Sequence, residues 1–150
     1  MESPLNIGEV KTPIDILNLK SSIRKMVDNN GIYSYIYFVL PDDALFIGTD
    51  KIGRIYVDFI GTIIEVQASV KTAPTGASII VDLNLNGTTI WTTQGNRVAI
   101  VAGAYTGAQT TPDVITLAVG DYFTIDLDQV GSTIAGAKLV VRLKIERAQS

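Results

Sequence analysis

From Ile32 onward the sequence consists of short β-type segments separated by turn residues, with no helical pattern between them. Eight segments are rich in Val, Ile, Thr and Tyr, and clusters of Gly, Pro, Asp or Asn separate them. They are IYSYIYFVL, RIYVDFI, TIIEVQASV, SIIVDLNLNG, TTIWT, RVAIVAG, YFTIDLDQV and KLVVRLKIE. Strands that follow one another without intervening helices form packed antiparallel sheets rather than a parallel α/β sheet. The sequence therefore predicts an all-β, antiparallel jelly-roll sandwich of about eight strands.

Several segments alternate apolar and polar side chains, which gives each strand one buried face and one solvated face. In residues 64–70, Ile64 and every second residue after it are predicted to face the core. The apolar residues left on the outward faces, such as Ile63 and Val140, are then candidates for contacts between subunits. Asn86 and Gly87 lie between two alternating runs and predict a tight hairpin turn.

Residues 1–31 are predicted to form an N-terminal arm with one amphipathic helix, and residues 32–150 the β jelly-roll domain. Thr12, Pro13 and Asp15 supply an N-cap hydroxyl, a proline at the first helical position and an acidic side chain in the first turn. Apolar residues then recur at helical spacing and form one stripe. This stripe either docks on the chain's own sheet or packs on a neighbouring subunit. The candidate partner-binding residues of the arm are Leu5, Ile7, Ile16, Leu19, Ile23 and Met26.

The composition excludes several kinds of chemistry, because the chain contains no cysteine and no histidine. Disulfides, thiolate and imidazole metal ligands, and the Ser/His/Asp and Cys/His nucleophilic systems are all removed. The net charge is -3 and no basic run occurs, which argues against nucleic acid as a partner. The longest apolar stretches fall far short of the roughly 20 residues of a membrane span. We therefore expect no catalytic residues, no cofactor, no metal, and neither nucleic acid nor membrane as a partner.

The stretch GDYFTIDLDQVGST contains three aspartates within eight positions. Asp126 and Asp128 alternate with apolar residues, so a strand would point both toward solvent, about 7 Å apart. A calcium site needs converging loop oxygens, and a glycosidase needs two carboxylates facing each other across a cleft. Asp121 follows a glycine and is predicted to hydrogen-bond local backbone in a turn. We favour a polar strand face, in one subunit or shared between subunits, made of Asp82, Asn84, Asp126, Asp128, Arg142 and Lys144.

Residues 103–112, GAYTGAQTTP, are small and polar and predict an exposed loop. Loops of this kind often carry binding residues, and the candidates here are Tyr105, Thr106 and Gln109. An exposed aromatic ring can stack on the face of a pyranose, which makes Trp91, Tyr105 and Tyr122 candidates for glycan binding. Trp91 also fits a position in the core or in an interface, which is the more common setting for a large aromatic residue.

Two stretches resemble the jelly-roll modules of tailed-bacteriophage virion proteins, a group that includes head decoration, head fibre and receptor-binding tail proteins. They are PTGASIIVDLNLNGTTIW (74–91) and LAVGDYFTIDLDQVGST (117–133), and the similarity extends over about residues 53–146. The entry from LAVGD into a strand is also similar to the trimeric jelly rolls of the tumour-necrosis-factor and complement globular-head type. This resemblance implies a homotrimer in the virion, made in the host cytoplasm.

The resemblance leads to the hypothesis of a trimeric bacteriophage capsid decoration protein that binds the major capsid protein or other virion proteins and stabilises the head shell. Such a protein works through buried area and multivalency and needs no catalysis. The alternative hypothesis is a receptor-binding or carbohydrate-binding jelly-roll module of the tail, with a glycan as ligand. A hydrolase that relies on Asp126 or Asp128 is the third and least favoured hypothesis.

Overall fold

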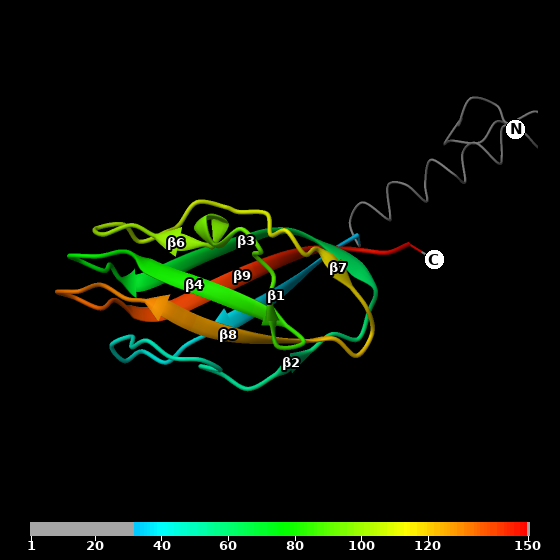
Figure 1. Cartoon of the computed structure of the whole chain (residues 1–150), viewed down its shortest axis with the longest axis horizontal. Coiled ribbons are helices and arrows are strands. Elements are labelled where there is room, and N and C mark those ends of the chain that lie inside the picture. The colour runs from blue at the N-terminus through cyan, green and yellow to red at the C-terminus, as the bar shows by residue number, and fades with distance from the viewer. Residues whose placement is uncertain (1–31, 150) are drawn as a thin grey trace, which may run out of the picture. The chain divides into compact units, whose positions relative to one another are not determined.

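The computed structural model describes residues 32–149, which fold into two antiparallel β-sheets packed face to face (Figure 1). The first sheet has the order β1-β9-β3-β7, and the second has the order β2-β8-β4-β5 with β6 also paired to β4. The described part of the chain is therefore an all-β, antiparallel jelly-roll sandwich, as predicted. The strands are Tyr33–Val39 (β1), Ile55–Tyr56 (β2), Gly61–Thr72 (β3), Ile79–Leu85 (β4), Thr88–Thr89 (β5), Ala99–Ile100 (β6), Thr116–Leu117 (β7), Tyr122–Gln129 (β8) and Ala137–Arg147 (β9).

The core lies between the two sheets and is built from the alternating apolar residues of the long strands. Val66 and Leu143 contribute from the first sheet, and Leu83 and Ile125 from the second. All four are fully buried. In the first sheet the residues beside them are only partly buried, which is the period-two pattern of a half-buried strand, whereas Asp82 and Thr124 of the second sheet are buried as well. The side chains that do not enter the core lie on the outer faces of the two sheets, where a ligand or partner would bind.

The hairpin and turn predictions of the second sheet are confirmed. Asn86 and Gly87 adopt φ values of 53° and 86°, the left-handed conformation that a two-residue hairpin turn requires. Leu85 and Thr88 pair directly across this turn, which joins β4 to β5. The Asp121 carboxylate accepts a hydrogen bond of 2.8 Å from the Ala118 backbone N–H, as a turn aspartate should.

The two stretches that carry the phage resemblance meet at both ends of the second sheet. At one end, Asn86 Nδ2 donates to the Asp121 carboxylate at 2.8 Å, and Tyr122 N–H donates to Asn86 Oδ1 at 3.1 Å. At the other end, Thr133 N–H donates to the Thr75 carbonyl at 3.0 Å. These contacts join the two stretches to each other. The residues of the resemblance therefore have a structural role in the second sheet.

One strand departs from the predicted alternation. Ile63 was expected to face outward, but it is 1% exposed and lies in the core. The pairing of β3 with β9 shifts register between Ile63 and Glu65, so Ile64 occupies a bulge and the facing of earlier residues reverses. The prediction that Ile63 contacts another subunit is wrong. Two short elements were also not predicted, strand β7 and the 3-10 turn at Gln94–Asn96.

The predicted arm residues Leu5, Ile7, Ile16, Leu19, Ile23 and Met26 lie outside the described residues, so the arm and its boundary stay predictions. Between residues 32 and 149 no helix is long and apolar enough to cross a membrane.

Candidate functional site

The predicted polar strand face is divided between two sheets. Asp126 lies on β8 of the second sheet, together with Asp128, whereas Arg142 lies on β9 of the first sheet, together with Lys144. Within one subunit the combined face does not form, because the residue pattern of a strand shows which side is polar but not which sheet the strand joins. A face shared between subunits stays a prediction. The remaining members, Asp82 and Asn84, lie on β4 beside Asp126 and Asp128.

The aspartates of the second sheet already bind neighbouring groups of the protein. The Asp126 carboxylate accepts hydrogen bonds of 2.8 Å from Asn84 Nδ2 and from the Asp50 backbone N–H. Asp128 forms an ion pair with Arg97. These contacts connect β8 to β4 and to the loop before β2, so they stabilise the sheet.

Asp82 is the most buried of these carboxylates, and it accepts a hydrogen bond of 2.6 Å from the Thr89 hydroxyl. Burial raises the pKa of Asp82, against the lowering effect of the Thr89 hydroxyl. Within residues 32–149 no group of Asp and Glu side chains is arranged to hold a metal ion. The acidic cluster of the second sheet therefore has a structural explanation.

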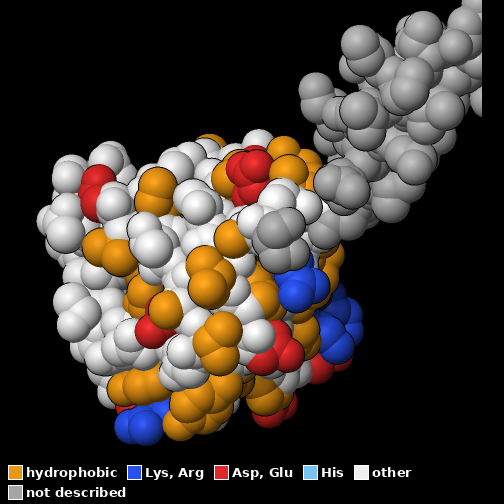
Figure 2. Space-filling model, turned by 90° about the vertical axis from the view of Figure 1, so that its right-hand side faces the viewer, with side chains coloured by type: hydrophobic (Ala, Val, Ile, Leu, Met, Phe, Trp, Pro, Cys, Tyr) orange, Lys and Arg blue, Asp and Glu red, His pale blue; other side chains and the backbone are white. Residues whose placement is uncertain are grey.

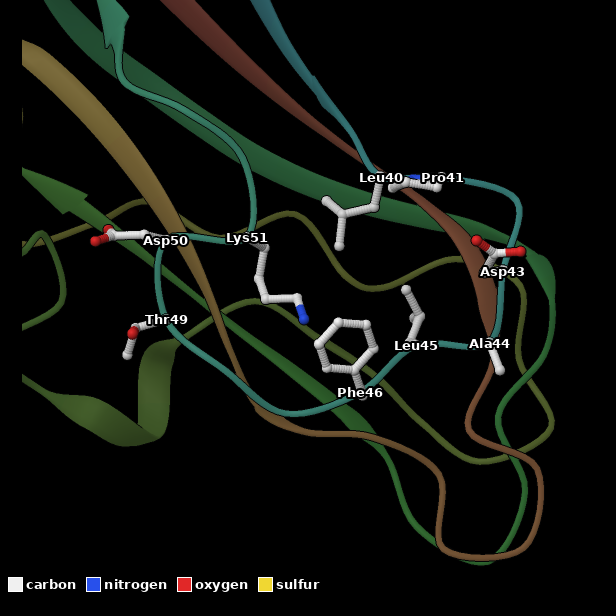
Figure 3. A pocket seen from close by; sticks show the side chains of 9 residues that line it. All are labelled: Leu40, Pro41, Asp43, Ala44, Leu45, Phe46, Thr49, Asp50 and Lys51. Atoms are coloured by element: carbon white, nitrogen blue, oxygen red, sulfur yellow. The ribbon is translucent and has the colours of Figure 1, made fainter.

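A pocket lies in the loop between β1 and β2, and Figure 3 shows its lining side chains. The Lys51 side chain points toward Phe46, and its Nζ lies 2.9 Å from the centre of the ring. Gly48 and Lys51 donate backbone hydrogen bonds to Leu127 and Ile125 of β8, which fixes the loop along the edge of the second sheet. The Phe46 side chain is 67% exposed, so the pocket keeps free aromatic surface on a ring that one cation already contacts.

The outer face of the first sheet presents a row of tyrosines. Tyr33, Tyr35 and Tyr37 occupy alternate positions of β1 and are 43%, 46% and 54% exposed. The rings of Tyr35 and Tyr37 are stacked, with 6.5 Å between their centres and 29° between their planes. Our sequence predictions missed this row, although tyrosine at every second position of IYSYIYFVL is a visible signal of one aromatic strand face.

Polar side chains from β9 and β3 lie on the same face. Arg142 Nη2 donates to Glu65 Oε1 and to Gln67 Oε1, both at 3.1 Å. The Arg142 guanidinium carbon lies 5.8 Å from the centre of the Tyr35 ring. Gln109, from the predicted exposed loop, donates to Glu65 Oε1 at 3.2 Å. We call this surface the tyrosine face, defined by Tyr33, Tyr35, Tyr37, Val39, Glu65, Gln67, Ser69, Val140 and Arg142.

An open groove of about 310 Å³ runs over the tyrosine face. Its lining comes from four segments of the chain: β1, β9, β3 and the loop 103–112. Thr106 reaches the groove because the loop forms a bridge with Ser69 at the free edge of β3. Two predicted loop residues, Thr106 and Gln109, thus join Arg142 on one surface, and Tyr105 is exposed beside them. The lining residues are Tyr37, Gln67, Ala68, Ser69, Thr106, Val140 and Arg142.

The other aromatic candidates lie elsewhere. Trp91 is fully buried, so the favoured assignment to the core is confirmed and a direct role in stacking on a sugar is wrong. Tyr122 lies on the second sheet, where its ring centre is 5.7 Å from that of Tyr56. The Arg54 guanidinium lies 4.4 Å from the centre of the Tyr122 ring and covers it. Tyr56 remains widely exposed and supplies a useful control position.

Further apolar side chains are exposed at the end of the β domain where β7 lies. Figure 2 views this end and shows hydrophobic side chains in several groups between polar ones. Ile60 and Val119 are exposed and line a shallow groove there, with Phe59 and Arg147 stacked at 4.7 Å between guanidinium carbon and ring centre. Among residues 32–149, no stacked pair of exposed rings lies in this groove.

Comparison with known proteins gives a weak structural likeness. No protein-family model and no curated protein matches the chain. Among solved structures, the chain is similar to the carbohydrate-binding module CBM36 in complex with calcium and xylotriose. The two are 18% identical, the match covers 76% of this chain and 72% of that chain, and the TM-score is 0.32. A likeness this weak carries no functional argument. What the fold and the site define is a β-sandwich with one exposed aromatic sheet face.

Proposed function

We propose that this protein is a non-catalytic binding module that recognises glycan on the tyrosine face. The observation that carries the proposal is the pair of exposed, stacked rings of Tyr35 and Tyr37 beside the hydrogen-bonded cluster of Arg142, Glu65 and Gln67. The sequence analysis gave glycan binding as its alternative hypothesis, with Trp91 and the loop 103–112 as candidates. The proposed binding surface is instead the outer face of the first sheet.

The chemistry of a sugar ring matches this pair of features. A pyranose has an apolar face of C–H groups, which an exposed tyrosine ring covers at low cost in side-chain entropy. Its rim carries hydroxyls, which need fixed donors and acceptors. Arg142 supplies donors only, while Gln67 supplies both donors and an acceptor. Because Glu65 and Gln67 already hold the guanidinium, ligand binding orders few additional groups.

The position of this module in a virion is part of the proposal and rests on the resemblance to phage jelly rolls. A glycan-binding jelly roll in a phage tail recognises the host surface, and several copies bound together raise the apparent affinity. The N-terminal arm, residues 1–31, is then the segment that attaches the module to other virion proteins.

A second candidate is the capsid decoration protein, a homotrimer on the phage head. It is favoured by the exposed apolar side chain of Val39, which lies with the tyrosines on β1, an edge strand of its sheet. An apolar edge of this kind suits burial against a second copy of the chain. In that case the tyrosine face is a subunit interface and is closed to glycans.

Binding to immobilised polysaccharides tests the first proposal. The full chain is run through gels that contain soluble polysaccharides, both neutral (glucans, xylan, glucomannan) and acidic (pectin, alginate), and its retardation is measured. Tyr37→Ala should abolish retardation, whereas Tyr56→Ala, at a tyrosine 62% exposed on the other sheet, should not. Equal retardation of both variants, or no retardation by any polysaccharide, contradicts the proposal.

Solution mass separates the second candidate from the first. Light scattering on the unmodified chain and on Tyr37→Ala should give the same mass if the tyrosine face is free. A trimer that dissociates on Tyr37→Ala supports the decoration hypothesis, and binding of that trimer to phage capsids completes the test.

A further inference from the structure

We infer that the groove on the tyrosine face binds an internal stretch of an extended, neutral glycan chain, which crosses the strands from Tyr37 to Thr106. This inference rests on the proposed function and adds the class of ligand and its direction. It follows from the course of the groove, from its open ends and from the charges along its floor.

The groove runs across the strands. Tyr37 lies on β1 at one side, Val140 lies on the neighbouring strand β9, and Ser69 pairs directly with Val140 from β3. Thr106 forms a bridge with Ser69 on the far side. Neighbouring strands are roughly 4.8 Å apart, so the three steps from β1 to the loop span about 14 Å. That length exceeds one pyranose ring and suits a short run of linked sugars.

Both ends of the groove open to solvent. Tyr37 is exposed on an edge strand, and Thr106 is exposed on the loop. A site that recognises a chain end surrounds the terminal sugar and buries most of its surface. Tyr37 and Thr106 are the outermost lining residues and both are exposed, which suits a chain that continues in both directions. The geometry favours internal segments of a polymer over its ends.

At the floor of the groove Glu65 of β3 contacts Arg142 and lies opposite Lys144, both on β9. Arg142 is the one charged residue of the lining, and Glu65 lies 3.1 Å from its guanidinium. The remaining polar lining consists of uncharged hydroxyl and amide groups on Gln67, Ser69 and Thr106. A sugar carboxylate placed over Arg142 meets the Glu65 carboxylate at close range, which costs energy. Hydroxyl groups meet no such repulsion, so neutral sugars are preferred.

The test uses the full chain and an oligosaccharide series from one to six sugars, prepared from the polysaccharide that retards it most. Affinities are measured by calorimetry, and by NMR titration for the weakest ligands. The dissociation constant should fall at least about tenfold from the monosaccharide to the trisaccharide. Two changes to the chain ends should leave the affinity of the longer chains unchanged. One is a methyl cap on the reducing end, and the other is removal of the hydroxyl of the non-reducing sugar at which the chain would be extended.

Thr106→Val supplies the residue-specific readout. It should weaken binding of the longer chains several-fold and leave monosaccharide binding unchanged, because the monosaccharide is expected to occupy the Tyr37 end. The control Thr88→Val changes an exposed threonine of the β4–β5 turn and should have no effect.

The outcomes separate this inference from the proposed function. Equal affinity for one sugar and three, loss of binding on capping, or preference for the acidic polysaccharides overturns the inference while glycan binding stands. No binding to any polysaccharide overturns both.

Discussion

Arg142 and Glu65 are 77 residues apart in the chain, and their side chains meet on the outer face of the first sheet with 3.1 Å between Nη2 and Oε1. The pair is partly exposed, at 33% and 21% of the two side chains. Ion pairs of this exposure contribute at most about 1 kcal/mol to the free energy of unfolding. The main effect of the pair is geometric, because Glu65 holds the guanidinium over the Tyr35 ring, 5.8 Å from its centre.

Replacement of this arginine is expected to separate binding from stability. Arg142→Met keeps the apolar stem of the side chain and removes its donors. Retardation by polysaccharide should fall at least about tenfold, since a hydrogen bond to a charged group contributes about 1.5–3 kcal/mol. The midpoint of urea unfolding should change little. Arg54→Met, at the arginine that covers Tyr122 on the other sheet, is the matched control and should bind as the unmodified chain does. Unchanged binding by Arg142→Met contradicts the assignment.

Trp91 should matter for folding and not for binding. Its ring is fully buried in the core, so Trp91→Ala should lower the free energy of unfolding by about 3–5 kcal/mol. Urea unfolding followed by circular dichroism measures this loss. The fraction that stays folded should bind polysaccharide as before, and a folded Trp91→Ala protein that has lost binding would argue for the original glycan hypothesis at this residue.

Gly131 is expected to tolerate no side chain. A Cβ atom there would lie 1.8 Å from the Ile134 carbonyl oxygen, in the loop that pairs with Thr75. Gly131→Ala should therefore destabilise the domain by several kcal/mol or prevent folding, since overpacking against backbone has no room to relax. Gly95→Ala is the control, because nothing lies within 4 Å of a Cβ at Gly95. Similar thermal midpoints for the two variants would contradict this prediction, because the loop would then have shifted to make room for the Cβ atom.

Asp121 should make part of the stability depend on pH. The Asn86 side chain, and secondly the Ala118 N–H, lower the pKa of Asp121 below its ordinary value of 3.8. A carboxylate with a lowered folded pKa stabilises the protein above its unfolded pKa, and this contribution is lost as the pH falls through the folded value. Asp121→Asn should thus lower the free energy of unfolding by under about 1 kcal/mol at pH 6, because the group is exposed. The loss should be smaller below about pH 3.

The control for this experiment is Asp58→Asn, at an exposed aspartate near the same end of the domain. Urea unfolding of the three proteins at both pH values measures the difference. A cost of Asp121→Asn that grows on acidification has the wrong sign and contradicts the role of the Asn86 contact.

The sequence allowed much of the second sheet to be predicted, because its signals are local. The left-handed turn at Asn86 and Gly87 and the backbone contact of Asp121 each depend on residues within a few positions. The bulge after Ile63 was not predictable, since it depends on the pairing of β3 with a strand about 80 residues later. Sheet membership is equally non-local, which is why the sequence did not place Arg142 beside Glu65 and Gln67 within one subunit.

The candidate site was only partly foreseen for the same reason. Thr106 and Gln109 were predicted as exposed loop residues, but their place beside Arg142 depends on how the loop follows the edge of β3. The tyrosine row of β1 was present in the sequence as a period-two pattern. Its importance depends on β1 being an edge strand, which the sequence alone does not give.

The most direct test of the account is to locate the bound glycan on the protein. Backbone amide shifts of the labelled full chain are recorded by NMR while the best-binding oligosaccharide is added. The account predicts the largest changes at Tyr37, Gln67, Ser69 and Thr106, with none at Tyr56 or Tyr122 on the other sheet. Changes confined to the second sheet, or to the loop of Phe46 and Lys51, would contradict it.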